Sequence, residues 1–208
     1  MKIITLDKDD FFEHCNKLLH KIDCLNQFNI IIGIERAGMH ILNYALGDIN
    51  KKNNSIYFGS LRIQRRTTIT KNNIKFLHIF PYCILNTLRK FERVCLMLII
   101  YIKGFFNIKG GNIIYIGDAL KKEIEKLTSG KILIFDDAID SGDTILESIK
   151  IIKQINPRLD IKIAVITVTR KMTKLKPDYS LYDSVMIRFP WSLDYKGNDW
   201  IEEKDICI

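Results

Sequence analysis

Two adjacent carboxylates, Asp136 and Asp137, follow the apolar run 132–135 and precede a loop of small and hydroxyl residues at 141–144. An apolar run without polar alternation suits a strand covered on both faces of a parallel sheet, where ligands bind beyond the carboxyl ends of the strands. A hydroxyl-rich loop that opens a helix can hold a phosphate. Two carboxylates can hydrogen-bond a sugar diol or bind the Mg²⁺ that accompanies a diphosphate. The segment therefore predicts a site for a phosphorylated ribose.

The same segment resembles the signature of the type I phosphoribosyltransferases, in which an apolar strand, two acidic residues, two variable positions and an acidic residue precede Ser/Thr-Gly-x-Thr. A receiver domain would carry its acidic pair near its start, and a P-loop ATPase needs G-x-x-x-x-G-K-[ST], which this sequence lacks. The remaining alternative is a plain strand–turn–helix with Asp140 as a helix cap. The resemblance implies transfer of ribose 5-phosphate from phosphoribosyl diphosphate to a nucleobase, with release of pyrophosphate.

The resemblance also implies roles for the residues of the signature. Asp136 and Asp137 would hold the ribose hydroxyls and the Mg²⁺ cofactor. Asp140 would be the general acid/base at the base ring. The loop for the 5-phosphate would consist of Asp140, Ser141, Gly142, Asp143 and Thr144.

A second motif, Glu35-Arg36-Ala37-Gly38, follows the apolar run 30–34. It resembles the diphosphate-binding loop of purine phosphoribosyltransferases, although Ala37 stands where many relatives have Gly. The resemblance implies a cis peptide between Glu35 and Arg36, bare N–H groups around Gly38, and stabilisation of the departing diphosphate by Arg36.

Two further motifs concern the base. A Phe-Pro-Trp run supplies Phe189 and Trp191, as in several xanthine–guanine-type members, where an acidic residue usually stands in place of Ser192. An aromatic ring there would stack on a flat base, and Arg170 or Lys171 would reach the oxygen of a 6-oxopurine. The alternatives are a structural Trp that closes the domain and a cation on a solvated turn.

Composition limits the other classes of function. The 208 residues, 47% of them apolar, are expected to form one domain over 1–208. The net charge of +8 accompanies an abundance of Ile, Lys and Asn typical of an AT-rich genome, so no nucleic-acid partner is expected. Five scattered cysteines and the lack of an apolar leader after Met1 predict a reduced, cytoplasmic protein.

Hydrophobic periodicity predicts an α/β fold, a parallel, doubly wound sheet flanked by helices. The resemblance to the family implies a small C-terminal hood over the base at about 170–208. A capping box at Asp7 and Asp10 opens the first helix. The resemblance to the family covers about 30–63 and 131–191. Strands are expected at 30–34, 55–63, 131–135, 161–168 and 183–188, and helices at 7–20, 39–46, 81–103 and 144–154.

A helical insertion at about 71–111 has no counterpart in the resemblance. Its expected helix, 81–103, ends in nine apolar residues at 94–102, too few to span a bilayer. Three interpretations stay open: a homodimer contact, a peripheral membrane contact through 81–106 aided by Arg89 and its basic neighbours, or packing on the chain's own core.

Two further expectations concern turnover. The basic residues Arg62, Arg65 and Arg66 lead into the region that in relatives is a mobile loop closing over the diphosphate. The insertion and the altered loop at Ala37 keep a second function open, that of a non-catalytic regulator that binds phosphoribosyl diphosphate or a nucleotide.

Overall fold

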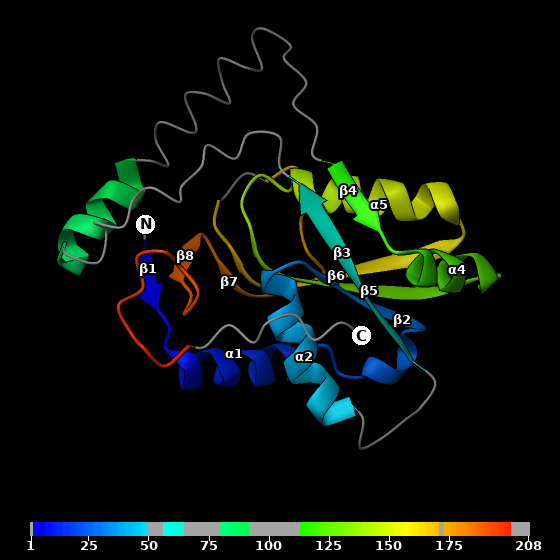
Figure 1. Cartoon of the computed structure of the whole chain (residues 1–208), viewed down its shortest axis with the longest axis horizontal. Coiled ribbons are helices and arrows are strands. Elements are labelled where there is room, and N and C mark those ends of the chain that lie inside the picture. The colour runs from blue at the N-terminus through cyan, green and yellow to red at the C-terminus, as the bar shows by residue number, and fades with distance from the viewer. Residues whose placement is uncertain (1, 50–55, 65–79, 92–112, 171–172, 201–208) are drawn as a thin grey trace, which may run out of the picture.

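The computed structural model describes residues 2–49, 56–64, 80–91, 113–170 and 173–200. Figure 1 shows strands between two layers of helices. The strands are β1 Lys2–Thr5, β2 Ile30–Ile34, β3 Tyr57–Gln64, β4 Ile113–Ile116, β5 Gly130–Ile139, β6 Leu159–Val168, β7 Tyr179–Asp183 and β8 Val185–Arg188. The helices are α1 Lys8–Lys21, α2 Ala37–Ile49, α4 Asp118–Lys126 and α5 Asp143–Ile155, with a 3₁₀ turn at Leu25–Gln27.

The main sheet confirms the predicted α/β class. Its six strands have the order β4-β3-β2-β5-β6-β7, and neighbours run parallel except for β4, which is antiparallel to β3 at the edge. The sequence analysis assigned no strand at β4. Helices α2, α4 and α5 stand between β2 and β3, β4 and β5, and β5 and β6 along the chain, so these connections cross over the faces of the sheet.

Each face of the sheet has its own apolar core. Ile31 and Leu133 pack with residues of α1 and α2, whereas Ile30 and Ile132 pack with residues of α4 and α5. Figure 1 shows these two helix pairs on opposite sides of the strands. Adjacent strand residues point to opposite faces, so the uninterrupted apolar runs in β2 and β5 result from burial on both sides.

Local signals located most elements but not their full lengths. The capping box is present, because Asp7 accepts from the Asp10 backbone N–H at 2.8 Å. The helix expected at 39–46 begins earlier, at Ala37. The signature strand expected at 131–135 continues to Ile139, because its pairing with β6 extends that far.

The strand expected at 183–188 is wrong in its extent, because Asp183 belongs to β7 and β8 begins at Val185. Ser184 has a φ of 60° and separates β7, which pairs with β6, from β8. Strand β8 pairs instead with β1 in a separate two-stranded parallel sheet. The sequence analysis assigned no strand at β1, which supplies this partner from the opposite end of the chain.

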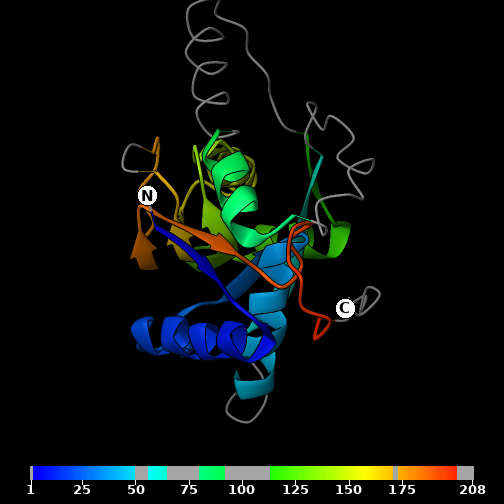
Figure 2. The same cartoon turned by 90° about the vertical axis from the view of Figure 1, so that its left-hand side faces the viewer.

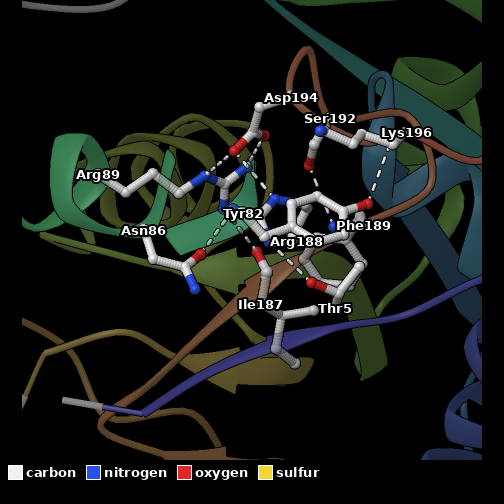
Figure 3. Close-up of polar contacts among 10 residues, drawn as sticks. All are labelled: Thr5, Tyr82, Asn86, Arg89, Ile187, Arg188, Phe189, Ser192, Asp194 and Lys196. Carbon is white, nitrogen blue, oxygen red and sulfur yellow. Dashed lines mark hydrogen bonds and ion pairs between the residues drawn. The ribbon is translucent and has the colours of Figure 1, made fainter. Parts of the chain in front are cut away.

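The first described part of the expected insertion is docked on the rest of the protein. Residues 82–91 are helical and lie beside β1 and the segment that follows β8 (Figure 2). The rest of the helix expected at 81–103, with its apolar end, lies outside the described residues. The docking contacts centre on what we call the Arg188 cluster, the side chains of Thr5, Tyr82, Asn86, Arg89, Arg188 and Asp194 (Figure 3).

Arg188 is the hub of this cluster and is only 1% exposed. Its Nε donates to Asp194 at 2.9 Å, its Nη1 to Thr5 Oγ1 at 2.8 Å and its Nη2 to Asn86 Oδ1 at 2.8 Å. Arg89 donates to both carboxylate oxygens of Asp194, with its Nε 2.7 Å from Oδ2. Two arginines around one buried carboxylate therefore join β1, β8, helix 82–91 and the C-terminal segment.

This arrangement decides part of the question left open for the insertion. Arg89 is paired within the Arg188 cluster, and Tyr82 lies with its ring centroid 4.5 Å from the Arg188 guanidinium carbon. Helix 82–91 is therefore packed on the chain's own core, and Arg89 is not free to meet a membrane surface. Among the described residues no helix is long and apolar enough to cross a membrane.

Candidate functional site

The candidate site lies where the connections of the main sheet diverge. Strand β2 leads to β3 on one side, whereas its neighbour on the other side, β5, leads to β6 and β7. Ligands of open α/β sheets bind in the crevice beyond the strand ends at such a switch point. A cavity of about 380 Å³ opens there, and its lining consists of Ile34, Glu35, Arg36, Ala37, Ile63, Asp136, Asp137 and Thr144.

The loop after β2 has the backbone that the sequence analysis predicted. The Glu35–Arg36 peptide is cis, and α2 begins at the next residue. The Glu35 N–H donates to the Leu61 carbonyl of β3 at 2.9 Å, and its carboxylate accepts from Ser60 Oγ at 3.0 Å. Arg62 lies 4.0 Å from Glu35 but is 78% exposed, so this ion pair contributes little.

Gly38 allows α2 to begin close to β5. A Cβ at this position would lie 2.2 Å from the carbonyl oxygen of Phe135, a backbone atom that cannot move aside independently. The sequence analysis assigned Gly38 to the diphosphate loop for its bare N–H. The structure adds a packing reason, because the first turn of α2 passes directly over the strand that carries Asp136.

The two carboxylates of the signature both reach the cavity. Asp136 is buried, and its Oδ1 accepts from the Asp137 backbone N–H at 3.0 Å; Asp137 is half-buried. The described residues contain no group of three His, Cys, Asp or Glu side chains arranged around a metal. Mg²⁺ is commonly bound by one or two carboxylates together with substrate phosphates. The donor set thus fits a Mg²⁺ that arrives with a diphosphate.

The loop 140–144 opens α5 as expected. Gly142 is its N-cap, with a φ of 87° in the left-handed region that glycine adopts without strain. The Ser141 hydroxyl donates to Asp143 at 2.9 Å, and the Asp143 N–H donates back to Ser141 Oγ at 3.3 Å. Thr144 lines the cavity. The alternative in which Asp140 caps the helix is wrong, because Gly142 holds that position.

Asp140 is instead bound by Arg170. The guanidinium donates from Nε to Oδ1 at 2.5 Å and from Nη2 to Oδ2 at 2.6 Å, a bidentate pair, and Thr169 Oγ1 donates to Oδ1 at 2.7 Å. Arg170 is 8% exposed. Arg170 and Lys171 were the two cations expected to reach a purine oxygen. Arg170 is hydrogen-bonded to Asp140, and Lys171 lies outside the described residues.

The two aromatic candidates lie in a cluster of rings. Phe189 is 4% exposed and stacks on Trp191, with ring centroids 4.9 Å apart and planes 5° from parallel. Trp191 also contacts Phe11, His40 and Trp200. Neither ring lines the cavity. Both rings pack within this cluster, and stacking of either ring on a base stays a prediction.

Three residues near the site escaped the sequence analysis. Ser60 holds Glu35, Thr169 holds Asp140, and Lys174 reaches Asp143 with its Nζ 2.6 Å from Oδ1. Thr169 precedes the two candidate cations but was given no role, and Ser60 and Lys174 stand in no motif. Each of the three acts across strands or loops far apart in the sequence.

Comparisons with known proteins agree with this fold. Residues 96–197 match the family described as "Phosphoribosyl transferase domain". This stretch of the chain is similar to that domain, and the fold is that of the type I phosphoribosyltransferases. No curated protein sequence matches it.

Solved structures share the fold over almost the whole chain. A purine phosphoribosyltransferase from Pyrococcus horikoshii has a TM-score of 0.57 at 19% identity, covering 92% of this chain and 95% of that one. A xanthine-guanine-hypoxanthine phosphoribosyltransferase from Helicobacter pylori has a TM-score of 0.56 at 15% identity, covering 92% of this chain and 95% of that one. A hypothetical protein from Neisseria gonorrhoeae with bound ppGpp has a TM-score of 0.55 at 14% identity, covering 91% of this chain and 89% of that one.

Proposed function

We propose that the chain transfers ribose 5-phosphate from phosphoribosyl diphosphate to a 6-oxopurine and releases pyrophosphate, as in purine salvage. The observation that carries the proposal is the cavity at the switch point, where Arg36 meets Asp136, Asp137 and Thr144. These residues come from two motifs about a hundred positions apart, and each motif supplies a different part of one phosphorylated ribose site.

The proposed roles follow from the charge that develops during the reaction. When the bond from the ribose to the diphosphate breaks, negative charge grows on the leaving group and positive charge on the sugar. Arg36 would stabilise the negative charge on the diphosphate, and Asp136 and Asp137 would hold the ribose hydroxyls beside the positive charge on the sugar. A Mg²⁺ bound with the diphosphate would supply further positive charge to the leaving group. The N-terminus of α5, with Thr144, would hold the 5-phosphate.

Asp140 is the proposed general acid/base at the ring nitrogen. Its carboxylate is already oriented by Arg170 and Thr169, so it needs no reorganisation to present a lone pair to the base. Arg170 keeps further N–H groups beyond the two that hold Asp140, and these could donate to an exocyclic oxygen next to the same ring nitrogen. Stacking by Phe189 or Trp191 has no support from their placement.

A panel of bases tests the substrate. We expect turnover with hypoxanthine, guanine or xanthine and at least tenfold less with adenine, because a guanidinium donates to an oxygen but not to an amino group. Release of pyrophosphate from phosphoribosyl diphosphate with each base measures this. A preference for orotate or uracil would contradict the purine assignment while leaving the phosphoribosyl site intact.

A second candidate is a regulator that binds phosphoribosyl diphosphate or a nucleotide without turnover. Ala37 favours it, because many relatives have Gly at this position of the diphosphate loop and Ala37 lines the cavity. The neighbour solved with ppGpp shows that a protein of this fold binds a nucleotide without a stated transferase activity. Tight binding of phosphoribosyl diphosphate with no turnover on any base would select this candidate.

The expected homodimer and the cytoplasmic location stay predictions. Helix 82–91 carries exposed apolar side chains at Ile84, Leu88 and Phe91 on the side away from the Arg188 cluster. They are compatible with a covering partner and do not identify one.

A further inference from the structure

The loop proposed to hold the 5-phosphate carries a carboxylate of its own. Asp143 is the first residue of α5, where a bound phosphate would meet the helix N-terminus. Its Oδ2 accepts from the Ser141 hydroxyl at 2.9 Å. A phosphate dianion that enters this loop would therefore face a like charge and would find one of its hydroxyl donors in use.

Lys174 lies on the other side of this carboxylate. Its Nζ is 2.6 Å from Asp143 Oδ1, and its backbone N–H donates to the Ser141 carbonyl at 3.1 Å. The next residue, Leu175, packs so closely that a Cβ on Gly142 would lie 3.3 Å from its nitrogen. The backbone of 174–175 is thus attached to the loop, and the ammonium group is held near it although its side chain is largely exposed.

The pKa of Asp143 is consistent with an ionised carboxylate that is bound by Lys174 and Ser141. Burial works to raise the pKa of the Asp143 carboxyl, but hydrogen bonds from Lys174 and Ser141 and the charges of Lys174 and Arg170 act in the opposite direction and leave the pKa below its ordinary value. The ionised Asp143 therefore occupies the two donors, the Ser141 hydroxyl and the Lys174 ammonium, that a phosphate at this position would use.

We propose that Lys174 is a further substrate-binding residue, which exchanges the Asp143 carboxylate for the 5-phosphate of the substrate. The inference rests on the proposed function, because it takes the loop 140–144 as the 5-phosphate site. Lys174 supplies the positive charge that lets a loop with its own carboxylate accept a dianion. The ligand class is a sugar 5-phosphate, and the diphosphate end of the substrate is not involved.

Calorimetry on the full chain separates the two ends of the substrate. Ribose 5-phosphate probes the 5-phosphate loop, and magnesium pyrophosphate probes the loop after β2. We expect Lys174→Ala to lower the affinity for ribose 5-phosphate about tenfold and to change the affinity for pyrophosphate by no more than about twofold. Lys174→Arg should keep most of the affinity for ribose 5-phosphate. Lys176→Ala, an exposed lysine two residues away, is the matched control and should leave both ligands unchanged.

A second variant tests the exchange itself. Asp143→Asn removes the competing charge, so ribose 5-phosphate should bind more tightly than to the wild type. In turnover, Lys174→Ala should raise KM for phosphoribosyl diphosphate with kcat little changed. Unchanged ribose 5-phosphate binding in Lys174→Ala would overturn the inference, and equal weakening of pyrophosphate would show a merely structural role. If the wild type binds neither ligand, the proposed function itself has failed.

Discussion

An Asp136→Asn/Asp137→Asn double substitution is expected to lower the affinity for phosphoribosyl diphosphate at least a hundredfold and to remove measurable turnover. Each charge-assisted hydrogen bond to the ribose diol contributes about 1.5–3 kcal/mol, and the double variant loses the charge of both. Among the described residues that line the cavity, Glu35 is then the remaining acidic side chain, so any benefit of Mg²⁺ to binding should shrink. Titration calorimetry with and without Mg²⁺ measures both effects.

The substitution is nearly isosteric, which keeps the test specific. An asparagine at 136 retains an oxygen that can accept the Asp137 N–H now bonded at 3.0 Å. Asp160→Asn is the control. Asp160 stands near the amino end of β6, whereas the cavity lies beyond the carboxyl ends of the strands. Equal binding by the wild type and the double variant would refute the assignment of the site to the strand end of β5.

An Asp194→Asn substitution is expected to lower the free energy of unfolding by about 3–5 kcal/mol, because it leaves two arginine side chains in the Arg188 cluster without their counter-charge. Arg188 has almost no exposed surface, so its charge cannot be solvated by rotation into water. Urea unfolding at neutral pH measures the loss. Arg89→Ala and Lys90→Ala form a matched pair on one helix, of which only the first should be strongly destabilising.

The same carboxylate predicts how stability depends on pH. Burial works to raise the pKa of Asp194, but hydrogen bonds and charges from Arg89 and Arg188 leave it below its ordinary value of 3.8. As the pH falls, the unfolded chain therefore takes up this proton before the folded chain does. The stabilisation is complete above about pH 5 and is lost as the pH falls through 3.8 toward the folded pKa. The difference in stability between the wild type and Asp194→Asn should accordingly shrink in acid, and a constant difference from pH 7 to pH 3 would contradict this.

The Arg188 cluster changes the interpretation of the insertion. From sequence, the basic residues of 81–103 were candidates for a membrane surface, because a helix with cations and an apolar end fits that role. Arg89 instead neutralises a buried carboxylate at position 194. The beginning of this helix therefore stabilises the C-terminal segment, and a function for the remaining residues must be compatible with that anchorage.

The sequence by itself determined the features that depend on neighbours along the chain. Uninterrupted apolar runs predicted the buried strands at 30–34 and 131–135, and the Asp7–Asp10 spacing predicted the start of α1. The signature segment predicted the order of strand, acidic pair, loop and helix. The resemblance to the family added the cis peptide at Glu35. Such signals are local, so a single sequence contains them in full.

Only the tertiary structure decided which distant side chains meet. The pairing of β2 with β5 brings Arg36 next to Asp136. Strand β1 pairs with β8, although the two stand near opposite ends of the sequence. Asp140 pairs with Arg170, and Asp194 pairs with Arg89. These partners depend on strand order and register, because a shift of one residue would turn every side chain of a strand to the other face. Periodicity does not record the register between strands, so the sequence supplied the candidates for the site and the fold selected their partners.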